Sequence, residues 1–186
     1  MKLHSTVISP GVALSTMRNK TDRNDARGIA QLMRLGWFKV VHVKSLEAQR
    51  LRMLLGCRKL VLRKLVDVEN EIRGTLRAFG LKVGSISRGR FAARVMTLAE
   101  QADALIAELV LRLLAVRATL LVEYRRMHLL LVKETLGDPV CRRLMTLPGV
   151  GPVAALAFRT GVDDPHRFER SRTVAAHFGM TPRRFQ

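Results

Sequence analysis

The stretch LEAQRLRMLLGCRKLVLRKLVDVENEIRGTLRAF, residues 46–79, carries apolar side chains on a seven-residue repeat. One seam of the repeat consists of Leu51, Leu65, Ile72 and Phe79, and a second seam of Leu54, Val61 and Val68. Such a repeat is typical of a coiled-coil helix. Arg58 interrupts it, and Gly56 and Gly74 each weaken a helix by about 1 kcal/mol relative to alanine. The stretch therefore predicts one long coiled-coil helix with an imperfect seam.

A second long helix is predicted after a turn. Residues 80–90, GLKVGSISRGR, hold three glycines and two serines, which favours a reversal of the chain. From Leu98 to Val132, apolar residues recur mostly at steps of three, four and seven, at Leu98, Leu105, Leu109, Leu113, Val116, Leu120, Met127 and Leu130. We expect this helix to pack antiparallel on the first and to stop at Gly137, where Asp138 can cap and Pro139 can open the next helix.

The composition indicates a helical protein with a polyanionic partner. Of the 186 residues, 48% are hydrophobic and only 5% aromatic, which favours a helical core over sheets or aromatic stacking platforms. Lysine and arginine total 33 against 15 acidic residues, giving a formal charge of +18. A field of this sign attracts phosphates, so nucleic acid is the expected partner.

The two cysteines and the first twenty residues bear on where the protein works. Cys57 and Cys141 stand far apart in helix-like sequence, which gives no disulfide framework and no cysteine-rich metal site. The N-terminal stretch has no long uncharged run and no signal-type cleavage context. We expect a reduced cytoplasmic protein without a membrane span.

Ahead of the long helices, the pattern is mixed. Residues 5–14 hold β-branched clusters around a Pro-Gly turn and suggest a strand remnant. Residues 22–35 predict a helix that begins after Thr21 and closes at Gly36. Residues 37–43, WFKVVHV, predict a short strand or an extended connector.

Asp22 and Asp25 stand in the first turn of that expected helix. At a spacing of three, both carboxylates project from one face, where they can contribute to a Mg2+ site. Acidic residues also favour the positive end of a helix dipole, and Thr21 is a good N-cap, so their spacing alone favours a purely structural role. The next acid along the chain is Glu47. Two carboxylates alone make a poor two-metal site.

The segment LMTLPGVGPVAALAF, residues 144–158, has the spacing of a helix-hairpin-helix motif. Its tight turn contains Pro148, Gly149, Val150 and Gly151, and Pro152 starts the second helix. Glycines let backbone N–H groups approach a phosphate, and the helix N-terminus adds partial positive charge. The alternative is a simple turn between two core helices.

Beyond this motif, Arg170 and Arg172 precede or open one more short helix with Val174, Ala175, Ala176 and Phe178 as its apolar residues. Gly179 closes that helix. The two arginines can follow a phosphate path, although a solvated basic surface explains them nearly as well.

Together these motifs resemble the IS110 family of insertion-sequence transposases. The resemblance is carried by KTDRNDARGIAQLMRLGW from residue 20, VHVKSLEAQRLRMLL from residue 41, LMTLPGVGPVAALAF from residue 144, and DDPHRFERSRTVAAHFGMTPRRFQ from residue 163. It covers nearly the whole chain from about Asn19.

This resemblance implies a RuvC-like nuclease domain whose DEDD acidic tetrad binds Mg2+, with Asp22 and Asp25 as its last two members. It also implies a coiled coil that mediates dimerisation, and a C-terminal domain that begins with the helix-hairpin-helix and supplies a serine nucleophile. Members of the family recombine DNA, and a bridge RNA guides their choice of target. The implied partners are therefore DNA, a guide RNA and a second copy of the chain.

The expected architecture is mainly α, with three parts. Residues 1–43 would be the C-terminal remnant of the RuvC-like α/β domain, residues 44–136 the antiparallel coiled-coil hairpin, and residues 137–186 the start of the transposase domain. The strands for the first two acids are missing, and the chain stops at Gln186, ahead of the expected serine. We therefore expect a truncated and catalytically incomplete transposase; the alternative is a non-enzymatic, basic, helical nucleic-acid-binding module.

Overall fold

The computed structural model describes residues 21–37 and 41–180. The chain forms two compact units, Met1–Ser45 and Leu46–Gln186. Every regular element in the described residues is helical, which confirms the prediction of a mainly α protein.

In the first unit, helix α1 spans Asp22–Arg34. Thr21 caps it by accepting a hydrogen bond from the Asn24 N–H at 3.2 Å. The helix closes at Gly36, which has a φ of +69°, a left-handed conformation that glycine adopts without strain. Both predicted ends are thus confirmed. Residues 41–45 form neither helix nor strand, while residues 5–14 and 38–40 lie outside the described part.

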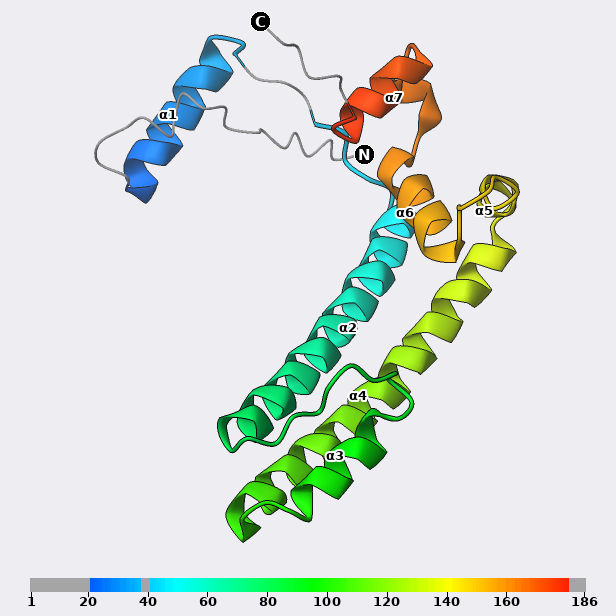
Figure 1. The fold of residues 1–186 in the computed structure, drawn as a ribbon. Coiled ribbons are helices and arrows are strands. Elements are labelled where there is room, and N and C mark those ends of the chain that lie inside the picture. Colours follow the sequence, from blue (N-terminus) through cyan, green and yellow to red (C-terminus); the bar gives the residue numbers. More distant parts are fainter. Residues whose placement is uncertain (1–20, 38–40, 181–186) are drawn as a thin grey trace, which may run out of the picture. The chain divides into compact units, whose positions relative to one another are not determined.

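The second unit is built on two long helices, α2 (Leu46–Ala78) and α4 (Ala104–Gly137), which run antiparallel and pack on each other (Figure 1). The first predicted seam is confirmed at Leu65 and Ile72, which are fully buried. At the end of α2 the prediction is wrong, because Phe79 lies beyond the helix and is 59% exposed.

The predicted continuous helix from Leu98 to Val132 is also wrong. A separate helix α3, Phe91–Ala99, precedes α4, and residues 100–103 break the two apart. Asp103 caps α4 by accepting a hydrogen bond from the Leu105 N–H at 2.9 Å. An aspartate that accepts a hydrogen bond from the backbone N–H two residues later favours a helix start over a helix interior.

Two hydrophobic clusters hold the second unit together. The cluster at the hairpin tip, hereafter the tip cluster, joins α2, α3, α4 and the loop between α2 and α3 through Ile72, Leu76, Val83, Phe91, Val95, Leu98 and Val110. At the opposite end, the base cluster contains Leu131, Cys141, Ala155 and Leu156. The base cluster attaches helices α5 (Pro139–Leu144) and α6 (Pro152–Val162) to the hairpin.

Beyond α6 follow a short 3-10 helix η2, Pro165–Arg167, and helix α7, Ser171–His177. The ring of Phe178 stacks on Phe158 of α6, with centroids 5.3 Å apart. This contact depends on Gly161, because a Cβ there would lie 2.6 Å from the Phe178 ring. Packing on α6 therefore fixes the end of α7. Within the described residues, no helix is both long enough and apolar enough to cross a membrane.

Candidate functional site

The turn between α5 and α6 presents its backbone to solvent. Pro148, Gly149 and Gly151 are exposed, and Val150 is half-buried. The Val150 N–H donates to the Leu147 carbonyl at 3.1 Å, and Gly149 adopts a φ of +81°, which disfavours any residue with a Cβ. A Cβ on Gly149 or Gly151 would meet nothing within 4 Å. The glycines thus leave room for a ligand to approach the backbone.

The first turn of α6 adds partial positive charge at this turn. Gly151 is the N-cap and has no side chain to accept from the first N–H groups, while Pro152 occupies the first helical turn. The uncapped N-terminus of a helix binds anions through these N–H groups. Arg142 and Arg143, in the last turn of α5, are exposed close by along the chain. The arrangement suits a phosphate.

Asp138 fixes the two helices that flank the turn. Its Oδ1 accepts hydrogen bonds from the Val140 and Cys141 N–H groups at 2.7 and 2.9 Å, and its Oδ2 lies 3.3 Å from Nε of Arg159 in α6. The cap had been predicted from Asp138 and Pro139, whereas nothing in the sequence pattern singled out Arg159 as its partner. One carboxylate therefore ties α5 to α6.

The thiol of Cys141 lies beside Asp138, in the base cluster. Burial, reinforced by the negative charge of Asp138, raises the pKa of Cys141 from 9.0 to about 11. A thiol with such a pKa stays protonated at neutral pH and is a poor nucleophile and a poor metal ligand. Its role is to pack in the base cluster.

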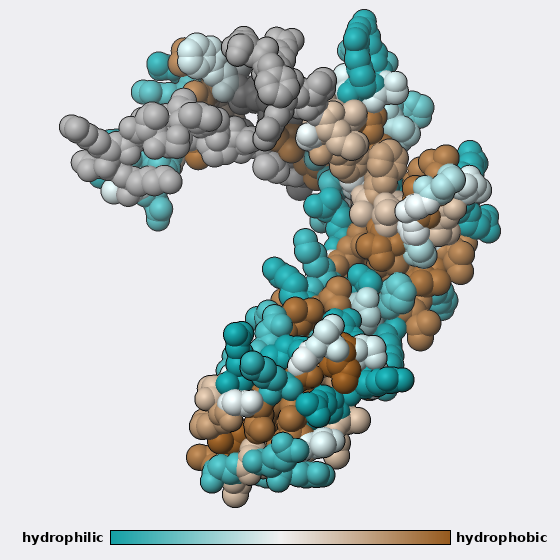
Figure 2. Space-filling model, viewed as in Figure 1, coloured by the Kyte–Doolittle hydropathy of each residue, from teal (hydrophilic) through white to brown (hydrophobic). Residues whose placement is uncertain are grey.

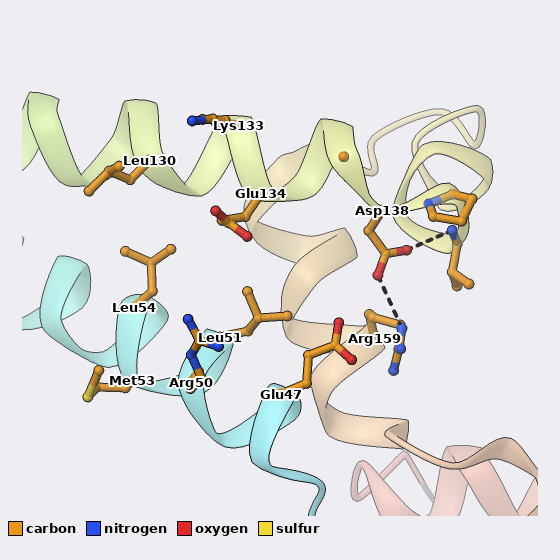
Figure 3. Close-up of a pocket in the computed structure, with 13 residues that line it drawn as sticks. Glu47, Arg50, Leu51, Met53, Leu54, Leu130, Lys133, Glu134, Asp138 and Arg159 are labelled. Atoms are coloured by element: carbon orange, nitrogen blue, oxygen red, sulfur yellow. Dashed lines mark hydrogen bonds and ion pairs between the residues drawn. The ribbon is translucent and has the colours of Figure 1, made fainter.

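A groove of about 930 Å³ opens between the start of α2 and the end of α4 (Figure 3). Leu51, Leu54 and Leu130 supply its apolar walls, and acidic and basic side chains of both signs stand around them. Because the charges are mixed, the groove does not select for an anion. The glycine turn does not line it.

Arg170 and Arg172 lie elsewhere. Arg170 is the N-cap residue of α7, Arg172 belongs to its first turn, and both are exposed. Figure 1 shows α7 at the end of α6 opposite to the glycine turn. The structure therefore gives two separate places where a backbone could be contacted, one at each end of α6, instead of one continuous site.

In α1, the two predicted metal ligands differ in environment. Asp22 is exposed, whereas Asp25 is half-buried on the helix face that also carries the buried Gly28. Oδ1 of Asp25 is buried and has no hydrogen-bond partner among the described residues. Thr21 rather than Asp25 caps the helix, and a carboxylate oxygen is a donor that suits a hard cation. No group of three or more potential metal-ligating side chains occurs within residues 21–37 and 41–180.

Two segments of the chain match family models of transposases. Residues 141–186 match the model described as the transposase IS116/IS110/IS902 family, and residues 4–80 match a second transposase model, of the DEDD type of IS110. No solved structure matches the chain.

Three relatives illustrate the similarity along the chain. A transposase for insertion sequence element IS1111A from Coxiella burnetii is 31% identical over 98% of this chain and 51% of its own length. A putative transposase, y4pF/y4sB, of Sinorhizobium fredii is 31% identical over 89% of this chain and 43% of its own. A probable family 20 transposase of Pseudomonas aeruginosa is 30% identical over 89% and 50%. The chain spans about half the length of these relatives.

Proposed function

The chain belongs to the IS116/IS110/IS902 family of transposases, and from this premise we propose that it binds DNA in the transposition of an insertion sequence. The observation that carries the proposal is the exposed turn Pro148–Gly151, which lies inside the C-terminal family match and combines open glycines, an uncapped helix N-terminus and nearby arginines. The turn would hold one phosphate, and Arg170 and Arg172 a second, without reading the base sequence.

The test is DNA binding as a function of salt. Contacts made by cationic groups release counterions, so affinity should fall steeply between about 50 and 200 mM salt. Gly151→Glu places a negative charge at the phosphate position and should weaken binding at least tenfold. Gly89→Glu adds the same charge at an open glycine of the hairpin tip and should have little effect. Absence of binding at low salt would refute the proposal.

We further assign Asp22 and Asp25 as ligands of a divalent metal. The buried, unpartnered Oδ1 of Asp25 supports this assignment, as does the match to a DEDD-type transposase model. When bound, such a metal would supply Lewis-acid stabilisation for cleavage of a phosphodiester. The two carboxylates would contribute negative charge and hold part of its coordination shell.

Metal binding can be measured without any catalytic assay. Titration with Mn2+, followed by its electron paramagnetic resonance signal, should show a site that Asp22→Asn/Asp25→Asn abolishes. The matched control, Asp67→Asn/Glu71→Gln, removes two acids from α2 and should leave the site unchanged. Equal loss in both variants would show that the bound Mn2+ is held by general charge. A chain that binds DNA but no metal would instead be a non-enzymatic, basic, helical binding module.

The outer face of α4 would bind a second copy of the chain. Opposite to the side that packs on α2, this face repeats apolar residues in a heptad-like pattern, at Leu111, Val122, Leu129 and Leu136. In Figure 2, apolar side chains appear among hydrophilic ones on the hairpin surface. Analytical ultracentrifugation should detect a dimer that Leu129→Lys dissociates and that Leu105→Lys, on another face of α4, preserves.

The proposed division of labour follows the predicted boundaries. Residues 1–43 would contribute metal ligands, residues 44–136 the dimerising hairpin, and residues 137–186 the DNA contacts. A guide RNA remains a proposed partner, and competition between RNA and DNA in the binding assay tests it.

A further inference from the structure

The first half of α2 carries a concentration of positive charge that the proposed function leaves unexplained. Between Glu47 and Asp67 the chain has six basic residues and no acidic one. Arg58 alone turns inward, where it donates a hydrogen bond to the hydroxyl of Tyr124 at 2.6 Å. The remaining five are exposed, namely Arg50, Arg52, Lys59, Arg63 and Lys64.

Three of these side chains share one outward face. Arg52, Lys59 and Arg63 stand at positions i, i+7 and i+11 of the helix, which places them on one stripe roughly 16 Å long. Leu65 and Ile72 point the other way, into the hairpin. The stripe therefore faces solvent. We call Arg52, Lys59 and Arg63, together with Gly56 between them, the α2 cationic face.

Three exposed cations of the hairpin have acidic partners. Arg112 pairs with Glu108 at 2.6 Å, Arg126 with Glu123 at 2.7 Å, and Lys64 with Asp67 at 3.1 Å. In the part of the chain that the structure describes, no such ion pair involves the three cations of the α2 cationic face. Moreover, Lys59 and Arg63 are four residues apart, a spacing at which like charges destabilise a helix. Asp67, four residues after Arg63, offsets part of that repulsion, but among the described residues it forms its ion pair with Lys64.

Gly56 stands in the middle of the face. A Cβ there would meet nothing within 4 Å, so no neighbour in the structure requires a glycine, and a glycine inside a helix weakens it. Because Gly56 has no side chain, the helix backbone is uncovered between the flanking cations. The phosphate backbone of a nucleic acid can therefore approach the helix closely. Helix α2 contains no Phe, Trp or Tyr, so the face has no aromatic platform on which unpaired bases could stack.

We propose that the α2 cationic face binds the sugar-phosphate backbone of duplex DNA, as a contact separate from the glycine turn and independent of base sequence. The inference rests on the proposed function for the identity of the nucleic acid. Three point charges along about 16 Å match a run of successive phosphates, and the lack of stacking residues favours a duplex over a single strand. The hairpin thereby becomes a DNA-binding element as well as a dimerising one.

The experiment compares two triple variants of the full chain that change net charge equally. Arg52→Gln/Lys59→Gln/Arg63→Gln removes the unpaired cations, whereas Lys64→Gln/Arg112→Gln/Arg126→Gln removes three cations that are already ion-paired. With a duplex of random sequence, the first variant should lose at least tenfold in affinity and reduce the slope of log affinity against log salt by about three. The second should change the slope by less than about one.

A third variant separates close approach from charge. Gly56→Leu keeps every charge and introduces a good helix former, yet it fills the space between the cations. Duplex affinity should therefore fall severalfold, while circular dichroism shows no loss of helix.

Equal salt slopes in the two triple variants, or unchanged affinity in Gly56→Leu, would overturn the inference. So would a loss confined to duplex RNA or to single strands. If the wild-type chain fails to bind duplex DNA at low salt, the proposed function itself fails. If it binds and only Gly151→Glu weakens it, the proposed function stands without this second contact.

Discussion

Arg117 lies inside the hairpin tip, where a charged side chain is stable only with partners. Its Nε donates to Oε1 of Glu69 at 2.9 Å, its terminal nitrogen donates to the Arg88 carbonyl at 2.9 Å, and its guanidinium lies 4.7 Å from the Phe91 ring centroid. Arg117→Met leaves the half-buried Glu69 with Arg88 alone, so we expect a loss of about 3 kcal/mol in the free energy of unfolding. Urea denaturation measures it.

The matched substitution is Arg112→Met, one and a half turns earlier in the same helix. Its ion pair with Glu108 is exposed, so the expected loss is below about 1 kcal/mol. Similar losses in the two variants would show that the buried pair adds nothing beyond a surface pair.

Gly161 is where α6 admits the ring of Phe178. Gly161→Ala would place a Cβ 2.6 Å from that ring. Because the ring stands at the end of a rotatable side chain, we expect it to move away and lose its stacking on Phe158. We predict loss of hydrogen-exchange protection in α7 with little change in the base cluster. Gly74→Ala, at an open position inside α2, should instead stabilise the chain by about 1 kcal/mol. Unchanged protection in α7 would mean that Phe178 does not hold it.

Cys141 links stability to alkaline pH. Because burial raises the pKa of Cys141 from 9.0 to about 11, the folded chain holds this proton more tightly than the unfolded chain does. The corresponding stabilisation is fully present below pH 9 and is lost as the pH rises towards 11. The difference in unfolding free energy between the wild type and Cys141→Ala should therefore be constant below pH 9 and shrink above it. A difference that does not depend on pH would contradict the shift.

For single residues, the sequence predicted the features that depend only on neighbours along the chain. Thr21 and Asp138 were recognised as caps, and the glycine turn was recognised by its spacing. Arg117 was not found, since an arginine at a core position resembles any surface arginine until its partner, Glu69, is brought beside it by the hairpin. The burial of Oδ1 of Asp25 could not be predicted either, because it depends on which residues the fold packs against that oxygen.

Among the elements, α5 depends most on a single residue. Asp138→Ala removes two hydrogen bonds to the α5 backbone and the ion pair with Arg159, so we expect a loss of about 1–2 kcal/mol in thermal unfolding. It should also raise the rate at which a thiol reagent modifies Cys141. Asp103→Ala, which removes the cap hydrogen bond to the Leu105 N–H of α4, should cost less and leave Cys141 unreactive. Unreactive Cys141 in both variants would argue against a shared anchor.

The two long helices differ in how well their sequences specify them. In α2 the apolar side chains form a stripe, so Leu65 and Ile72 were placed correctly in the core. In α4 apolar residues occur on every side, and the predicted positions Leu105, Leu109 and Leu130 prove to be more than half exposed. A helix that is apolar all round carries no signal for which side faces its neighbour. The break before Asp103 was hidden by the same uniformity.

For the whole molecule, the two units should differ in local stability. Of the α1 residues only Gly28 is buried, whereas α2 buries Ala48, Leu65, Ile72 and Leu76. Native-state hydrogen exchange should therefore show α1 amides opening at a lower free energy than amides at Leu65 and Ile72. Exchange of α1 at the global free energy of unfolding would show instead that the units are cooperative.

Family membership could be inferred from the order of short motifs along the chain, since each motif keeps its residues together. The spatial relation of the predicted DNA contacts could not, because it depends on how α6 and α7 pack. Arg170 and Gly149 lie 21 positions apart in sequence and at opposite ends of one helix in space. The α2 cationic face was not predicted, because a heptad pattern describes only the apolar side of a helix.

The contact between Arg58 and Tyr124 also allows the two units to be followed by intrinsic fluorescence. The protein contains one tryptophan and one tyrosine; Trp37 is exposed in the first unit, and Tyr124 stands in the second beneath the guanidinium of Arg58, 4.9 Å from its ring centroid. Each unit thus holds a different natural fluorophore. Selective excitation of the indole would follow the first unit, and the phenol emission would follow separation of the hairpin helices, without any attached dye.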